Sequence, residues 1–200
     1  MIKNCIFDFG NVLAVFDPDK LTAPYFSDAA LRREISGVVF DRIYWDKLDN
    51  GTISDEEVKE GIRSRVDAEY ADRACAVYDD WVKNLEPFEG MTEAVKYIRS
   101  RGIRLYLLSN ISMGFASQYK NVKWIKDLFD MFEGLVFSAE TRLVKPDGEI
   151  FRYILDKFGL ERDECIFVDD SPANISGAES VGIRGVLFKG DASVLLKLFE

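Results

Sequence analysis

The stretch that decides the fold is Lys3-Asn-Cys-Ile-Phe-Asp-Phe-Gly-Asn-Val-Leu-Ala-Val15, in which Asp8 is the single acidic residue among mostly apolar and small neighbours. The apolar residues before Asp8 predict a short buried strand that ends at this carboxylate. In open α/β sheets, ligands bind in the crevice outside the carboxyl ends of the strands. We therefore expect Asp8 to lie at the edge of a binding site.

Polar residues follow three later apolar runs in the same way: Ser109-Asn110, Lys145-Pro146 and Asp169-Asp170. Each pair has an ordinary structural explanation, because Ser and Asp cap helices, Pro begins them and loop lysines are common. Two adjacent carboxylates, however, repel each other unless a cation or hydrogen-bond donors lie between them, and hard oxygen ligands suit Mg²⁺. The ordinary explanations do not account for all three pairs occurring in order, each at the end of a predicted strand.

From residue 87 onward the sequence alternates between strand and helix patterns. Buried strands are predicted at 104–109, 134–138, 164–168 and 185–188. Helices are predicted at 91–101, 114–128, 147–158, 171–180 and 192–199. This alternation predicts an α/β fold in which a parallel sheet has helices on both faces.

Residues 15–87 differ in character, because they are rich in charged and aromatic residues and lack strand patterns. Amphipathic helices are predicted at 29–48, 54–70 and 72–85, and Ser54 with Glu57 forms a capping-box motif at the start of the second. The stretch could fold as a separate helical domain. Its position after the first strand favours an insertion instead, so we expect a core of residues 1–14 and 88–200 and an inserted helical domain of residues 15–87.

Charge and composition exclude several classes of function. The net charge of −9 argues against nucleic-acid binding, which needs a positive surface, and means that a phosphate ligand would need local cations. The sequence has no histidine, which rules out Ser-His, Cys-His and His-ligated metal mechanisms. Any proton transfer must then fall to carboxylates, Lys, Tyr or Cys.

The sequence also predicts where the protein works. Its three cysteines are widely spaced and odd in number, so we interpret them as reduced core residues. No apolar run reaches the roughly 18 residues that indicate a membrane span, and the N-terminus lacks a signal-peptide pattern. We expect a cytoplasmic protein with no membrane partner.

The chain resembles, in order and context, the four signature motifs of the haloacid dehalogenase (HAD) superfamily, at Asp8, Ser109, Lys145 and Asp169-Asp170. Local strings add to the resemblance, namely Leu-Leu-Ser-Asn110, Val-Lys-Pro146 and Asn174-Ile-Ser-Gly-Ala178. The last is similar to the branch that contains sugar-phosphate phosphatases and the phosphatase domain of soluble epoxide hydrolases. The resemblance spans the whole chain. It implies a Rossmann-like three-layer core with strand order 3-2-1-4-5, Asp8 on the central strand, and a helical cap at residues 15–87.

The resemblance further implies a Mg²⁺-dependent phosphatase that acts on a small phosphorylated metabolite. Asp8 would attack phosphorus to give an aspartyl-phosphate, which water then hydrolyses. The implied Mg²⁺ ligands are Asp8, Asp169, Asp170 and the backbone carbonyl of Gly10. The implied phosphate-binding groups are Lys145 and Ser109, assisted by Asn110 and the amides of the first loop at Gly10 and Asn11.

Gly10 departs from the pattern, because phosphatases of the family have an aspartate there that protonates the leaving oxygen and later activates water. General acid–base help of this kind is worth about 10²–10⁴-fold. A phosphatase without it would be slow, would borrow Asp17 or a carboxylate of the cap, or would prefer leaving groups that depart readily. A sugar 1-phosphate fits the last case, and the glycine motif is similar to that of bacterial α-glucose-1-phosphate phosphatases. The sequence sets neither the actual substrate nor the oligomeric state.

Two other functions stay open. Haloacid dehalogenases also lack the second aspartate and use no metal, but Asp169-Asp170 would then be an uncompensated pair of charges. A HAD fold that binds a phosphorylated ligand or a partner protein and turns over poorly is the other alternative. Aromatic residues of the cap could close over a substrate, although such residues more often belong to a core. The candidates are Tyr44, Trp45, Trp81 and Phe88.

Overall fold

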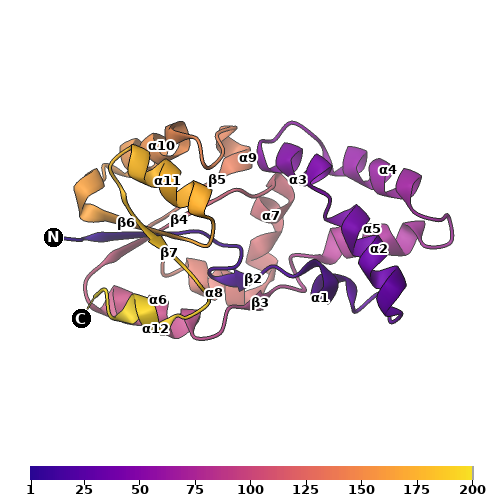
Figure 1. The fold of residues 1–200 in the computed structure, drawn as a ribbon, viewed down its shortest axis with the longest axis horizontal. Helices are drawn as coiled ribbons and strands as arrows, with labels where there is room; N and C mark the ends of the chain where they lie inside the picture. Colours follow the sequence, from indigo (N-terminus) through magenta and orange to yellow (C-terminus); the bar gives the residue numbers. More distant parts are fainter. Residues whose placement is uncertain (200) are drawn as a thin grey trace.

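The computed structural model describes residues 1–199. It contains a five-stranded parallel sheet in the order β5-β4-β1-β6-β7 (Figure 1). Its strands are β1 (Asn4–Phe7), β4 (Arg104–Ser109), β5 (Gly134–Phe137), β6 (Cys165–Asp169) and β7 (Arg184–Leu187). Strand β1 pairs with β4 on one side and β6 on the other. Numbered along the chain, these strands have the order 3-2-1-4-5. The predicted α/β class, strand order and central first strand are therefore confirmed.

Helices cover both faces of the sheet. One face packs against α6 (Met91–Ser100), α7 (Met113–Gln118), α8 (Lys123–Phe129) and α12 (Ser193–Leu196). The other face packs against α10 (Gly148–Phe158) and α11 (Pro172–Ser180). None of the helices within residues 1–199 is long and apolar enough to cross a membrane.

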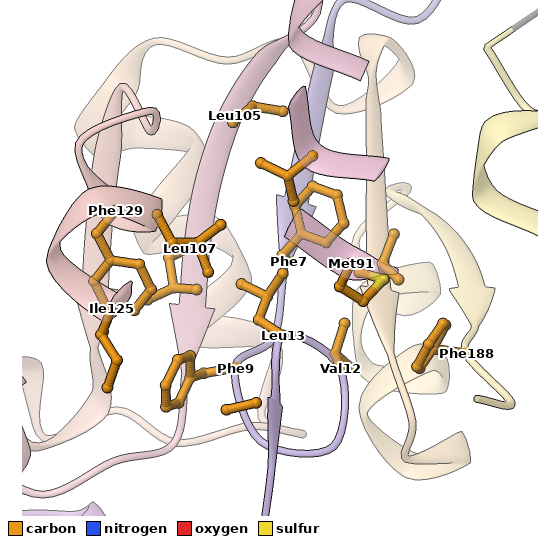
Figure 2. Packing of buried hydrophobic residues seen from close by; sticks show 14 of the residues in the cluster. Phe7, Phe9, Val12, Leu13, Met91, Leu105, Leu107, Ile125, Phe129 and Phe188 are labelled. Atoms are coloured by element: carbon orange, nitrogen blue, oxygen red, sulfur yellow. The ribbon is translucent and has the colours of Figure 1, made fainter. Parts of the chain in front are cut away.

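The three central strands, β4, β1 and β6, are mostly apolar because both of their faces are buried. Successive side chains alternate, so Phe7 of β1 packs in one apolar cluster and Ile6 packs in the other. Figure 2 shows the first cluster, where Phe7 and Leu107 lie near Met91 of α6 and Phe129 of α8. All three cysteines are buried and unpaired, as predicted.

Five helices lie between β2 (Ala14–Val15) and β3 (Glu86–Pro87), two short strands that pair antiparallel. They are α1 (Pro18–Thr22), α2 (Ala29–Val39), α3 (Arg42–Asp49), α4 (Asp55–Arg65) and α5 (Ala71–Asp80). Four of them, α2 to α5, share an apolar cluster of their own, which includes Ile35, Val58 and Val77, whereas Leu21 of α1 packs in the cluster shown in Figure 2. Because the chain leaves and returns at one place, we propose that residues 15–87 form an inserted cap on a core of residues 1–14 and 88–200, of which residue 200 lies outside the described part of the chain.

Several predicted elements differ in extent from the structure. The predicted helix at 29–48 is two helices, because the side chain of Asp41 accepts a hydrogen bond from the Ile43 amide at 3.0 Å and begins α3. The helices predicted at 54–70 and 72–85 end earlier, at Arg65 and Asp80, and the final helix has four residues only. The capping box at Ser54 is confirmed. The sequence did not indicate the β2–β3 pair or α9 (Ser138–Thr141).

Candidate active site

Asp8 lies directly after β1, at the carboxyl edge of the sheet. Its amide donates to the carbonyl of Val168 at 2.9 Å, which continues the parallel pairing with β6 beyond the strand. The amide of Phe9 donates to the Asp8 carboxylate. Only 8% of the residue is exposed. The backbone thus holds this carboxylate at the position that the first sequence run predicts.

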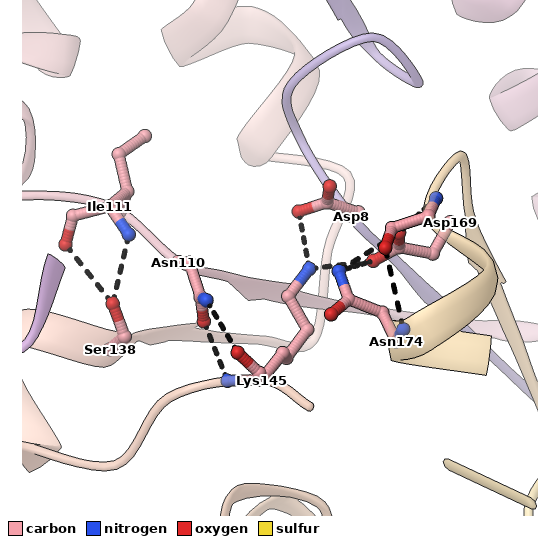
Figure 3. Close-up of polar contacts among 8 residues, drawn as sticks. Asp8, Asn110, Ile111, Ser138, Lys145, Asp169 and Asn174 are labelled. Atoms are coloured by element: carbon pink, nitrogen blue, oxygen red, sulfur yellow. Dashed lines mark hydrogen bonds and ion pairs between the residues drawn. The ribbon is translucent and has the colours of Figure 1, made fainter. Parts of the chain in front are cut away.

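Lys145 joins two carboxylates that lie far apart in the sequence. Its Nζ atom is 2.7 Å from Oδ1 of Asp8 and 2.7 Å from Oδ2 of Asp169. The side chain of Asn110 fixes the lysine backbone, accepting from the Lys145 amide at 2.8 Å and donating to its carbonyl at 2.9 Å. Figure 3 shows this chain of contacts from Asn110 through Lys145 to Asp8 and Asp169.

Burial and charge act against each other in this cluster. Burial raises the pKa of Asp8 to about 6 even though the neighbouring ammonium of Lys145 lowers it. Burial alone would lower the pKa of Lys145, but the charges of Asp8 and Asp169 outweigh it and the pKa is raised. Lys145 therefore remains a fixed cation at the centre of the site.

The two adjacent carboxylates have different surroundings. Asp169 is fully buried, and its oxygens accept from Lys145, from the Asn174 side chain at 3.0 and 3.1 Å, and from the Ser171 amide at 2.8 Å. Asp170 is exposed, and partial desolvation together with the charge of Asp169 raises its pKa. Asp169 thus anchors the lysine, whereas Asp170 faces the solvent side.

The carboxylates also suit a metal ion. Asp8, Asp169 and Asp170 each offer one oxygen, and these oxygens all lie within 4.8 Å of one another. Hard oxygen donors in such a group are the set that Mg²⁺ prefers. The ammonium of Lys145 balances one of these negative charges, and its ion pairs are with Asp8 and Asp169. The residues present therefore fit a divalent cation.

A cavity of about 660 Å³ opens over this cluster, between the core and the helices of residues 15–87. Most of the predicted site residues line it: Asp8, Gly10, Asn11, Ser109, Asn110, Lys145 and Asp170. Asp169 does not, because it lies behind Lys145. Four aromatic residues of the 15–87 segment also line it, namely Phe16, Phe40, Trp45 and Trp81.

Two of the four aromatic candidates line the cavity. Trp45 and Trp81 do so, and their ring centroids lie 5.1 Å apart. Phe88 packs instead against Phe188, and the ring of Tyr44 lies under the guanidinium of Arg65.

Other cavity residues were not predicted. Ser171 is the N-cap residue of α11, and Asn174 lies in the first turn of that helix. From α3 the structure adds Arg42, Asp46, Asp49 and Asn50 at its end. The spacing of these four residues places them on one helix face. A polar helix face in a sequence is equally typical of a solvated surface, so this spacing did not identify them as cavity residues. Asp17, considered as a substitute acid, does not line the cavity and accepts instead from the first amides of α1.

Comparison with known proteins places the fold in a family. Residues 2–182 match the model of the haloacid dehalogenase-like hydrolases. The chain is 24% identical to the sesquiterpene phosphatase astK of Aspergillus oryzae, over 98% of this chain and 94% of that protein.

Solved structures agree with this placement. A HAD family enzyme from Bacteroides thetaiotaomicron in a magnesium complex is 26% identical, with a TM-score of 0.71 over 94% of each chain. That enzyme has also been solved with magnesium and inorganic phosphate. The L-2-haloacid dehalogenase of Xanthobacter autotrophicus has the same fold at 17% identity, with a TM-score of 0.66 over 92% of this chain and 76% of that one. The predicted membership is confirmed: the chain belongs to the haloacid dehalogenase-like hydrolase family.

Proposed function

We propose that this protein is a Mg²⁺-dependent phosphatase that hydrolyses a small phosphorylated metabolite through an aspartyl-phosphate on Asp8. The observation that carries the proposal is the position of Lys145, a buried cation held between Asp8 and Asp169 beside the cavity. In a chain of net charge −9, this ammonium is the local cation that a phosphate needs. The phosphatase named among the relatives supports the same reaction.

Asp8 is the nucleophile of this mechanism. Lys145 holds one of its oxygens, Oδ1, and thereby orients the other for attack. A bond forms between this oxygen and phosphorus while the bond from phosphorus to the leaving oxygen breaks. Water then attacks the phosphorus, releases phosphate and restores the Asp8 carboxylate.

The remaining residues hold the phosphate. Lys145 would pair with one of its oxygens, and Ser109, buried at the end of β4, would donate its hydroxyl. Asn110 would act largely through Lys145, since its side chain is hydrogen-bonded to that backbone. The amides at Gly10 and Asn11 would complete the cradle.

Asp8, Asp170 and the carbonyl of Gly10 would hold the metal, and Asp169 would support them by fixing Lys145. When bound, Mg²⁺ supplies positive charge to the phosphoryl oxygens.

Two observations bear on the substrate. The missing acid at Gly10 favours a leaving group that departs readily, and the polar α3 face could receive hydroxyl groups, which makes a sugar 1-phosphate our first candidate. The aromatic residues that line the cavity favour a second candidate, the phosphate of an apolar alcohol, and a relative is a sesquiterpene phosphatase. The free buried cysteines favour a reducing compartment, so we propose that the enzyme acts in the cytoplasm.

The test is phosphate release from sugar 1-phosphates, sugar 6-phosphates and prenyl phosphates, with Mg²⁺ or EDTA, by the wild type and by Asp8→Asn. We expect metal-dependent turnover that the variant loses. Chloride release from 2-chloropropionate without metal would instead identify a dehalogenase. A folded protein that binds Mg²⁺ but hydrolyses no ester would have a binding or regulatory role.

A further inference from the structure

Because residue 10 is glycine, the active site has no evident general acid, but its cavity contains a further carboxylate. Asp49, at the end of α3, lines the same cavity as Asp8 and Lys145. Its Oδ1 atom is buried and has no hydrogen-bond partner within residues 1–199. Buried carboxylate oxygens almost always have donors. An enclosed oxygen beside the cavity that lacks one is suited to a partner that arrives with the substrate.

The core holds Asp49 at this place. The hydroxyl of Ser138, in α9, donates to the backbone carbonyl of Asp49 and accepts from the Ile111 amide at 2.9 Å. Figure 3 shows Ser138 against Ile111, two residues beyond the predicted phosphate-binding Ser109. One hydroxyl therefore connects the end of α3 to the loop that follows β4.

A second contact fixes the turn after α3. Gly51 has a φ of +68°, and a Cβ atom added there would lie 2.8 Å from the carbonyl oxygen of Ala139. The backbone of this turn therefore packs directly on α9, and Figure 1 shows α3 beside α9. Close backbone packing, rather than a flexible loop, sets where the Asp49 side chain lies.

The charges around Asp49 suit a group that gives and takes a proton. Burial raises the pKa of Asp49 to about 7. Asp46 and Asp8 act in the same direction, whereas Arg42 and Lys145 act against it. Near neutral pH both forms of the carboxyl group are then populated, as general acid–base catalysis requires.

We propose that Asp49 is the general acid and base of this active site, in place of the aspartate that Gly10 lacks. The proposal rests on the proposed phosphatase function. In the first step the Asp49 carboxyl donates its proton to the leaving oxygen as the bond from that oxygen to phosphorus breaks and Asp8 becomes phosphorylated. In the second step the Asp49 carboxylate takes a proton from the attacking water, the bond from phosphorus to Asp8 breaks, and both aspartates return to their starting states.

The test compares the hydrolysis of two phosphate esters by Asp49→Asn and by the wild type. Both are measured in single turnovers in the presence of Mg²⁺. An alkyl phosphate needs protonation of its leaving oxygen, whereas p-nitrophenyl phosphate does not. We expect the variant to be about 10²–10⁴-fold slower with the alkyl ester. With p-nitrophenyl phosphate it should release a burst of nitrophenolate at close to the wild-type rate and then accumulate phosphorylated Asp8. A merely structural role would slow both esters alike.

Glu60→Gln is the control, because it removes an exposed carboxylate from α4, outside the cavity. Its loss should leave the ratio of the two ester rates unchanged. Equal ratios in the wild type and in Asp49→Asn would overturn the inference while the phosphatase stands. A wild type that releases no phosphate from any ester would overturn both.

A measurement on the wild type keeps the inference testable if Asp49→Asn does not fold. The ratio of the alkyl-ester rate to the aryl-ester rate should fall as the pH rises through about 7, since only the alkyl ester needs the protonated Asp49. Ionisation of Asp8 affects both rates and cancels in the ratio. A ratio independent of pH would contradict the proposal.

Discussion

The ammonium of Lys145 lies 2.7 Å from the carboxylate of Asp8, and only 1% of the lysine side chain and 11% of the aspartate side chain are exposed. An ion pair so shielded from water depends on both partners, because either charge alone would be costly to bury. The second carboxylate on Lys145, that of Asp169, is fully buried. The site is thus held together by the same charges that we expect to bind phosphate.

Replacing Lys145 by Met should therefore destabilise the protein as well as inactivate it. The change leaves Asp8 and Asp169 buried without their cation, which costs about 3–5 kcal/mol of unfolding free energy. Urea denaturation measures this. Lys123→Met is the control, because its ion pair with Asp127 is exposed and should matter little. Equal midpoints for the two variants would contradict the structural role of Lys145.

Mg²⁺ should raise the melting temperature of the wild type, because the folded protein brings three carboxylates together. Binding adds about 2.7 kcal/mol at a concentration about 100 times Kd. Asp170→Asn should reduce the Mg²⁺-dependent shift, and EDTA should abolish the shift in the wild type. Asp163→Asn, exposed in η2 (Arg162–Glu164), should retain the full shift. A full shift in Asp170→Asn would place the metal elsewhere.

Gly51→Ala should weaken the contact between α3 and α9. The new Cβ would meet the Ala139 carbonyl in a left-handed backbone conformation, a strain worth about 1–3 kcal/mol. Gly37→Ala is the matched control in α2, since a Cβ there meets no atom within 4 Å and alanine favours the helix by about 0.5–1 kcal/mol. We expect opposite shifts in melting temperature; shifts of the same sign would show that the packing on α9 is loose.

Asp49 should make stability depend on pH in a defined direction. Its pKa is about 7 in the folded protein against 3.8 for the free side chain, so between these values the folded state binds the extra proton. This contribution is fully present below about pH 4 and is lost as the pH rises to about 7. Asp49→Asn lacks the ionisation, so its melting temperature relative to the wild type should rise between pH 5 and pH 8. A difference that stays flat over this pH range would contradict the expected titration of Asp49.

Gly10→Asp should restore turnover of alkyl phosphates in the Asp49→Asn background. A Cβ at Gly10 would have one neighbour within 4 Å, the Cβ of Phe16 at 4.0 Å, so the side chain has room. We expect a gain of about tenfold or more in the alkyl-ester rate, because an acid is again present. Gly10→Asn in the same background has the same shape without the proton. A gain with Asn as well would point to a steric cause.

The sequence determined the fold and the polar end of the site. Asp8, Ser109 and Asp169 lie at or just beyond the ends of apolar runs, and the carboxyl ends of parallel strands share one edge of the sheet. Periodicity and helix caps are local properties, so the strands, most helices and the capping box at Ser54 could be predicted from short stretches of chain. Family resemblance supplied the strand order.

The tertiary structure decided what closes the site. Asp49 lines the same cavity as Asp8 because the end of α3 contacts Ser138 and Ala139, about 90 residues later in the chain. The tertiary structure also gives the two adjacent carboxylates different surroundings, because Asp169 is buried against Lys145 and Asp170 is exposed. A sequence pattern shows which residues share one helix face, but the surface that this face meets depends on contacts between distant segments, which form only when the whole chain has folded.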